Sequence, residues 1–174
     1  MRLLLAPQIV KRLHRELRRA KRREIGGLLM GEHVRDEIFR VVDISVQRSG
    51  GSQSCFIRNP KDHQAQLQDF FARTSEDYSR FNYLGEWHSH PSFAAAPSIT
   101  DIQTMQSIVS DPAVGVNFLT LLIVKLSRKK KFEATAVAFR MGALPTDVLV
   151  SVETDGQAES KGGAHRWLRK IFRL

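Results

Sequence analysis

Two histidines and one aspartate in the stretch EWHSHPSFAAAPSITD are the residues of this sequence whose types and spacing best suit metal binding. His88 and His90 are two positions apart, and Asp101 follows eleven positions after the second histidine. On a strand, residues two apart face the same side, so both imidazole rings would lie close together. Two imidazoles and a carboxylate leave a fourth position for water, which is the open arrangement of a catalytic zinc site. The pattern therefore predicts a metal centre.

The same residues also fit an ordinary strand, turn and helix cap. Histidines two apart on a strand are more often surface or hydrogen-bonded residues than ligands, so His-x-His alone favours this interpretation. Ser98 and Asp101 form the Ser-x-x-Asp pattern of a capping box at the start of a helix. The combination of the histidine pair with a following aspartate strengthens the case for a metal.

A zinc hydrolase also needs a general base, and two glutamates compete for that role. Glu86 precedes the histidines on the same face of the predicted strand and would lie beside the metal. Glu24 opens the glycine-punctuated segment EIGGLLMG, which is distant in sequence and would approach from across the fold. Spacing alone does not choose between them.

Composition indicates a folded domain without disulfides. The chain has 174 residues, of which 42% are hydrophobic, and this suits one compact domain with its own core. The single cysteine, Cys55, excludes an internal disulfide and a cysteine-rich zinc site, so His, Asp or Glu must hold any metal. The apolar run near the first residue is too short for a signal-peptide core, and no later segment would span a membrane. We therefore expect a cytoplasmic protein.

Positive charge is concentrated near the two ends of the sequence. The net charge is +9, and residues 11–23 contain eight Lys or Arg against one Glu. Such a segment could contact nucleic acid, an anionic membrane or an acidic protein, or it could be a solvated helix face. No aromatic residue interrupts it and no nucleic-acid motif is present, so sequence-specific DNA binding is not expected.

Hydrophobic periodicity predicts three helices and five strands. The helices are expected at about 9–22, 61–74 and 98–110, and the strands at about 24–33, 38–48, 81–90, 116–127 and 132–142. Because helices and strands interleave without strict alternation, we expect an α/β domain with a mixed sheet flanked by helices. Residues 1–152 would form this domain, 153–165 a flexible linker and 166–174 a basic amphipathic tail.

Two separated motifs resemble the JAMM (JAB1/MPN/Mov34) metalloproteases. HSHPSFAAAPSITD reproduces the family's His-x-His, ten residues, Asp signature, and EIGGLLMG is similar to its upstream segment, a Glu followed by Gly-x-Leu-x-Gly. The resemblance runs from about Glu24 to about Arg140 and is similar in particular to bacterial members. Gly26 stands where many relatives have Cys, a change expected to alter packing rather than chemistry.

The resemblance implies a fold, a cofactor and a role for each site residue. The fold would be the MPN/JAB1 type, a mixed, curved sheet flanked by helices, with the zinc site at a strand–loop–helix junction. His88, His90 and Asp101 would bind Zn²⁺. Glu24 would be the general acid/base, and Ser98 would donate a hydrogen bond to the oxyanion.

The resemblance also implies a substrate class. Such enzymes cleave peptide or isopeptide bonds after the Gly-Gly tail of ubiquitin or a ubiquitin-like protein, and bacterial forms act on bacterial modifiers. The partners would be such a modifier, its conjugates, and the activating and conjugating enzymes of the same pathway. Two other functions stay open, a non-catalytic MPN scaffold and a basic adaptor in a multiprotein or nucleic-acid complex.

Overall fold

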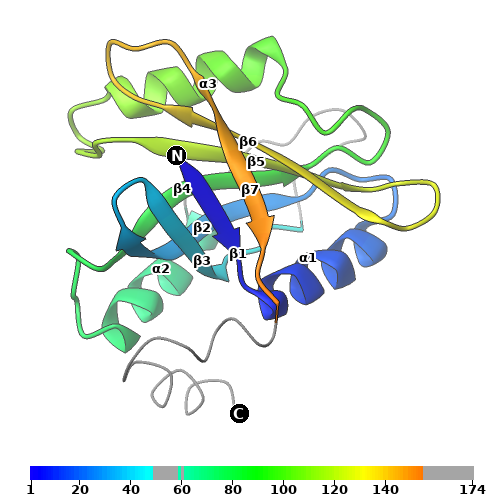
Figure 1. Cartoon of the computed structure of the whole chain (residues 1–174), viewed down its shortest axis with the longest axis horizontal. Coiled ribbons are helices and arrows are strands. Elements are labelled where there is room, and N and C mark those ends of the chain that lie inside the picture. Colours follow the sequence, from blue (N-terminus) through cyan, green and yellow to red (C-terminus); the bar gives the residue numbers. More distant parts are fainter. Residues whose placement is uncertain (49–58, 60, 155–174) are drawn as a thin grey trace.

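Seven strands close into one barrel in the order β1-β3-β2-β4-β5-β6-β7 (Figure 1). The structure, a computed structural model, describes residues 1–48, 59 and 61–154. Its strands are β1 (Arg2–Leu5), β2 (Gly26–Arg35), β3 (Ile38–Ile44), β4 (Phe81–Ser89), β5 (Leu119–Leu126), β6 (Phe132–Phe139) and β7 (Thr146–Val152). Its helices are α1 (Pro7–Ala20), α2 (Lys61–Arg73) and α3 (Ile99–Ser110).

The three predicted helices and five predicted strands are confirmed, with shifts of a few residues at their ends. The pattern 38–48 predicts a longer strand than β3, which ends at Ile44. Beyond it, the Ser45 N–H still donates to the Leu28 carbonyl at 3.1 Å, and Gln47 forms an isolated bridge to Gly26. Strands β1 and β7 were not predicted.

Those two unpredicted strands close the sheet. β1 pairs in parallel with β3 on one side and with β7 on the other, where Leu3 lies opposite Val150. The predicted mixed sheet with flanking helices is therefore confirmed. Its closure into a barrel was not predicted. A strand of four residues has little local signal, and its pairing with a partner nearly 150 positions away depends on tertiary packing.

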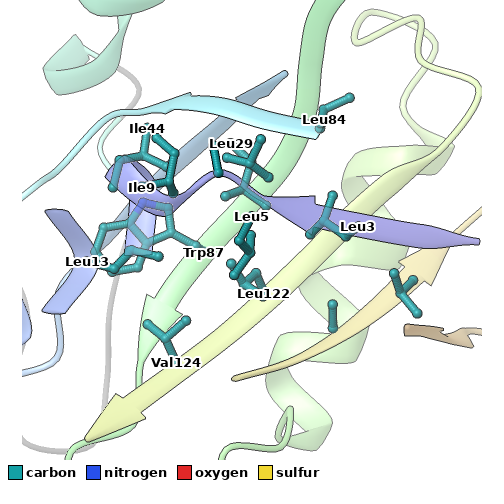
Figure 2. Packing of buried hydrophobic residues seen from close by; sticks show 14 of the residues in the cluster. Leu3, Leu5, Ile9, Leu13, Leu29, Ile44, Leu84, Trp87, Leu122 and Val124 are labelled. Carbon is teal, nitrogen blue, oxygen red and sulfur yellow. The ribbon is translucent and has the colours of Figure 1, made fainter. Parts of the chain in front are cut away.

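The larger core lies between α1 and one face of the sheet (Figure 2). Pro7 occupies the first turn of α1, where its fixed φ suits a helix start, and Ile9 and Leu13 lie on its buried side. Trp87 of β4 is fully buried in this core, and its indole Nε1 donates to the Ser45 carbonyl at 2.9 Å. The indole therefore fixes which face of β4 points inward.

A smaller core lies under α3 on the opposite face of the sheet. Met105 of α3 packs with Leu121 and Ile123 of β5. Since Trp87 points to the α1 side, its strand neighbours His88 and Glu86 point to the α3 side. The sheet thus separates a mainly apolar face from a face on which polar residues meet α3.

The folded domain extends to the end of the described segment. Glu153, the first residue of the predicted linker, accepts from Arg40 Nε at 3.0 Å and donates its backbone N–H to Leu5. The remainder of the predicted linker and the predicted tail, residues 155–174, lie outside the described residues. Among the described helices, none combines the length and apolar character needed to cross a membrane.

Candidate metal centre

Strand β4 holds the two histidines side by side. It pairs antiparallel with β2 and parallel with β5, so His88 lies between Gly26 and Ile123 in the sheet. Both imidazoles are largely buried, with 8% of His88 and 7% of His90 exposed. Their Nε2 atoms are 3.1 Å apart, which matches the expectation that residues two apart on a strand share a face.

The first turn of α3 brings a carboxylate to the same point. Asp101 Oδ1 lies 3.5 Å from His88 Nε2, and Asp101 Oδ2 lies 3.9 Å from His90 Nε2. Ser98 caps the helix, because its Oγ accepts from the Asp101 N–H at 3.2 Å while Oδ2 accepts from the Ser98 N–H at 2.7 Å. The capping box and the His–His–Asp cluster therefore coexist rather than exclude one another.

A backbone contact orients the ring of His90. Its Nδ1 lies 2.9 Å from the Ala94 carbonyl oxygen, which only accepts hydrogen bonds, so Nδ1 carries the hydrogen. In the neutral ring, the lone pair of Nε2 then points toward His88 and Asp101. Histidine ligands of metals commonly donate their second ring nitrogen in this manner.

The dimensions of the cluster suit a tetrahedral ion. Zinc bonds of about 2.0–2.2 Å at tetrahedral angles place neighbouring ligand atoms about 3.3 Å apart. The separations of 3.1, 3.5 and 3.9 Å lie close to that value, and one ligand atom from each residue falls within 4.8 Å of the other two. Two imidazole nitrogens and a carboxylate oxygen are also donors that zinc accepts. His88, His90 and Asp101 can therefore hold a metal ion.

The charges of this cluster act on the ionisation of Glu24. Only 4% of Glu24 is exposed, and burial raises its pKa while the nearby His90 and His88 act to lower it. Its neighbour Ile25 bonds to Ser89 in both directions, at 3.0 Å to Oγ and 2.8 Å from the Ser89 N–H. These bonds fix the entrance of β2 beside the end of β4.

Glu86 faces the α3 side but is not part of the cluster of possible ligands. It lies two residues before His88, and the Tyr83 hydroxyl donates to its carboxylate at 3.5 Å.

The surroundings of Asp101 lower its pKa. Burial alone would raise the Asp101 pKa, but the hydrogen bond and charge of His88, with hydrogen bonds from Ser98, lower it well below 3.8. Asp101 is thus ionised at neutral pH.

Side chains hold the loop between the histidines and α3 by donating hydrogen bonds to three of its consecutive carbonyl groups. Lys125 Nζ donates to the Phe93 carbonyl, His90 to that of Ala94, and Thr135 Oγ1 to that of Ala95. The His90 N–H bonds to the Val124 carbonyl at 3.0 Å, which places Lys125 beside His90 on the same face. Sequence analysis missed Lys125 and Thr135, since the β4–β5 and β5–β6 registers bring them to the loop.

Comparison with known proteins relates this chain to one protein family. A family model described as prokaryotic homologs of the JAB domain matches residues 6–142. A CD-NTase/cGAS isopeptidase of Vibrio cholerae serotype O1 is 37% identical over 94 residues, which are 52% of this chain and 58% of that protein. The ubiquitin carboxyl-terminal hydrolase RPN11 of Saccharomyces cerevisiae is 31% identical over 142 residues, or 80% of this chain and 43% of that protein. The aligned regions thus span about half the length of these curated relatives.

A solved structure supports the fold independently. Protein DSY2949 from Desulfitobacterium hafniense superposes with a TM-score of 0.62 at 18% identity, covering 91% of this chain and 99% of the other. At that identity, the similarity concerns the arrangement of helices and strands alone.

Proposed function

The chain belongs to the prokaryotic homologs of the JAB domain, and from this premise we propose that it is a zinc-dependent hydrolase of peptide or isopeptide bonds. The observation that carries the proposal is the convergence of His88, His90 and Asp101 beside the buried Glu24. The similarity to proteins named as an isopeptidase and as a ubiquitin carboxyl-terminal hydrolase supports the same reaction class.

Zinc would be held by His88 Nε2, His90 Nε2 and the Asp101 carboxylate. When bound, Zn²⁺ would lower the pKa of water to about 7 and polarise an amide carbonyl. The low pKa of Asp101 keeps its carboxylate charged, as a ligand must be. The bond from His90 Nδ1 to Ala94 keeps the other ring nitrogen available to the ion.

Glu24 would be the general acid/base of the reaction. It would take a proton from the attacking water and pass it to the departing amine, so one side chain serves both steps. A buried carboxylate with a raised pKa suits this work, because its proton affinity moves toward that of the groups it serves. Glu24 lies two residues before β2, so it belongs neither to the strand nor to the helix that bear the proposed ligands.

Ser98 would stabilise the oxyanion that forms when water attacks the carbonyl. Its hydroxyl donates to Asp101 Oδ2 at 2.7 Å, so it must rotate away from that oxygen to reach the substrate. Its backbone N–H bonds to the same carboxylate oxygen and would keep Asp101 in place during this rotation. An oxyanion donor of this kind contributes roughly a hundredfold to a thousandfold in rate.

The substrate would be a ubiquitin-like protein joined through its C-terminal Gly-Gly to a lysine or to a following peptide. The activating and conjugating enzymes of the same modification pathway would be further partners. Exposed apolar side chains lie next to the site, with 51% of Phe93 and 76% of Ile99 exposed. They support the proposal because an extended tail that passes the cluster would find apolar contacts on the loop and on α3.

The proposal is tested by incubating the protein with a ubiquitin-like domain joined through Gly-Gly to a fluorescent reporter. We expect the wild type to release the reporter, a zinc chelator to stop release, and added zinc to restore it. Glu24→Gln should bind zinc and remain inactive. If the wild type binds zinc but cleaves neither peptide-linked nor lysine-linked substrates, the non-catalytic scaffold becomes the better account.

A further inference from the structure

A cationic pocket lies beside the candidate metal centre. Its volume is about 290 Å³, and five positively charged side chains line it, those of Arg18, Lys21, Arg23, Lys125 and Lys130. These five residues define the cationic pocket. No acidic side chain is among its lining residues. The residues come from the end of α1, the segment before β2, the end of β5 and the turn that follows it.

The pocket shares its rim with the candidate site. Ser89 and Pro91, which also line it, are the neighbours of His90 in the chain, and Arg23 directly precedes Glu24. Consecutive Cα atoms are about 3.8 Å apart, so the rim begins one residue from the proposed ligand and the proposed base. A substrate chain bound at the metal centre is therefore within reach of the pocket.

Acidic side chains of the described residues do not neutralise the charges of the pocket. Across the described segments, none of its five cations forms an ion pair with an acidic side chain. By contrast, Arg15, Arg19 and Arg48 surround the buried Glu16 at 2.9–3.6 Å on the adjoining part of α1. Glu133 lies opposite Lys125 in the β5–β6 ladder, but the Lys125 ammonium bonds to Phe93 instead.

The end of α1 opposes this positive charge only weakly. A helix C-terminus has about half a negative charge, far less than five cations contribute. The pocket is also held in shape, because His14 Nε2 on α1 lies 3.3 Å from the Lys130 carbonyl of the β5–β6 turn. Figure 1 shows α1 beside the end of this hairpin.

We infer that the cationic pocket binds an acidic peptide segment of the substrate that flanks the bond to be cleaved. This inference rests on the proposed function for the identity of the chain that passes the site. A pocket of this volume accommodates a few side chains, and carboxylates would meet uncompensated ammonium and guanidinium groups there. Single-stranded nucleic acid fits less well, because no aromatic side chain lines the pocket for base stacking.

Binding is measured first without catalysis, by fluorescence anisotropy of a labelled peptide of alternating Glu and Gly. Arg18→Glu plus Lys130→Glu should weaken binding about tenfold or more, since an exposed ion pair contributes up to about fivefold. Arg35→Glu plus Lys61→Glu, on exposed residues elsewhere, loses the same net charge and should change affinity less than twofold. The conservative pair Arg18→Lys plus Lys130→Arg should retain binding, and far-UV circular dichroism of the charge-reversed pocket variant should show the wild-type fold, which excludes misfolding as the cause.

Three results of this binding measurement would overturn the inference. Equal losses in the two charge-reversed variants would mean that diffuse surface charge binds the peptide. No loss in the pocket variant would exclude the pocket itself. Tighter binding of single-stranded oligothymidine than of the acidic peptide, lost in the pocket variant, would assign the pocket to nucleic acid.

Cleavage of two matched Gly-Gly substrates then separates this inference from the proposed function. One substrate has Glu residues flanking the scissile bond and the other has Gln at those positions. We expect the acidic substrate to have the lower KM in the wild type, and the pocket variant to lose that preference. If neither substrate is cut but the acidic peptide still binds through Arg18 and Lys130, the proposed hydrolase fails and the anion-binding pocket stands. If both are cut with equal KM, the pocket does not contribute to substrate binding.

Discussion

The ammonium group of Lys125 on β5 donates a hydrogen bond to the backbone carbonyl of Phe93, in the loop that joins the histidines to α3. Two further bonds hold the next carbonyls of the same loop, from His90 to Ala94 and from Thr135 to Ala95. Since Asp101 follows this loop, its position relative to the histidines depends on these contacts. The geometry of the candidate metal centre is thus set partly by residues outside the ligand set.

Lys125→Met should loosen the loop and weaken zinc binding. Residues that orient metal ligands from the outside typically contribute about 10–100-fold to metal affinity or activity. We expect a loss near the lower end of that range, measured as the zinc dissociation constant by competition with a chelator. Lys131→Met, at an exposed lysine of the same hairpin, is the matched control and should retain wild-type affinity. Unchanged zinc affinity in Lys125→Met would mean that the loop keeps its shape without this bond.

Glu24→Gln should separate catalysis from folding and metal binding. Removal of a general acid/base lowers the rate by roughly 10²–10⁴-fold. Zinc content should be unchanged, because Glu24 is not in the ligand cluster. Retained activity would transfer the general-base role to another residue, with Glu86 the first to examine by the corresponding Glu86→Gln substitution.

The same substitution should stabilise the metal-free protein at neutral pH. Burial raises the pKa of Glu24 above 4.5, so the folded state prefers the neutral carboxyl. This preference contributes stability below the unfolded pKa and is lost as pH rises through the folded pKa. Gln is neutral throughout, so metal-free Glu24→Gln should have a higher melting temperature than the wild type at pH 7. As pH falls toward 4, the melting temperature of the wild type should rise relative to that of the variant. A lower melting temperature at pH 7 would contradict this assignment.

Ser98→Ala should affect both rate and stability, and Ser98→Thr should affect neither strongly. Loss of the hydroxyl removes the proposed oxyanion donor, which lowers kcat roughly a hundredfold or more. It also removes the α3 cap seen in the bond from the Asp101 N–H to Ser98 Oγ, which costs about 1 kcal/mol of unfolding free energy. Thermal unfolding and kcat would be measured on both variants. A stability loss with normal kcat in Ser98→Ala would reduce Ser98 to a helix cap.

Gly27→Ala should destabilise the fold through the strand that follows Glu24. A Cβ at Gly27 would lie 2.1 Å from the Ser45 carbonyl oxygen, which is backbone and cannot rotate away. The entropic gain of Gly→Ala, about 0.4–1 kcal/mol, is smaller than the roughly 1–3 kcal/mol that overpacking costs. We expect a net loss of stability in chemical denaturation. An increase in stability would show that β2 and β3 separate easily at this point.

Local sequence patterns predict the part of the site that is formed by β4, the loop after it and α3. The alternation of β4, the proline after His90 and the cap at Ser98 place both histidines and Asp101 within one strand–loop–helix unit. The approach of Glu24 depends on the β2–β4 register, in which Gly26 pairs with His88. Spacing could not choose Glu24 over Glu86 for this reason, and the family resemblance supplied that choice.

Features that depend on long-range pairing were missed altogether. The closure of the barrel by β1 and β7 and the contact of Lys125 with the loop each join segments far apart in the chain. In β1 the apolar run RLLL is too short to show a strand period. The excess of cations near residue 20 was visible in the sequence, but its concentration in a pocket beside Ser89 and Pro91 required the fold.

Metal content of the purified protein tests the central claim most directly. Elemental analysis should find about one zinc ion per wild-type chain, as a three-residue open site requires. The double substitution His88→Ala plus Asp101→Ala should abolish that zinc while far-UV circular dichroism shows the fold retained. A wild type that stays free of zinc after reconstitution would contradict the account, and the cluster would then be an ordinary strand and helix cap.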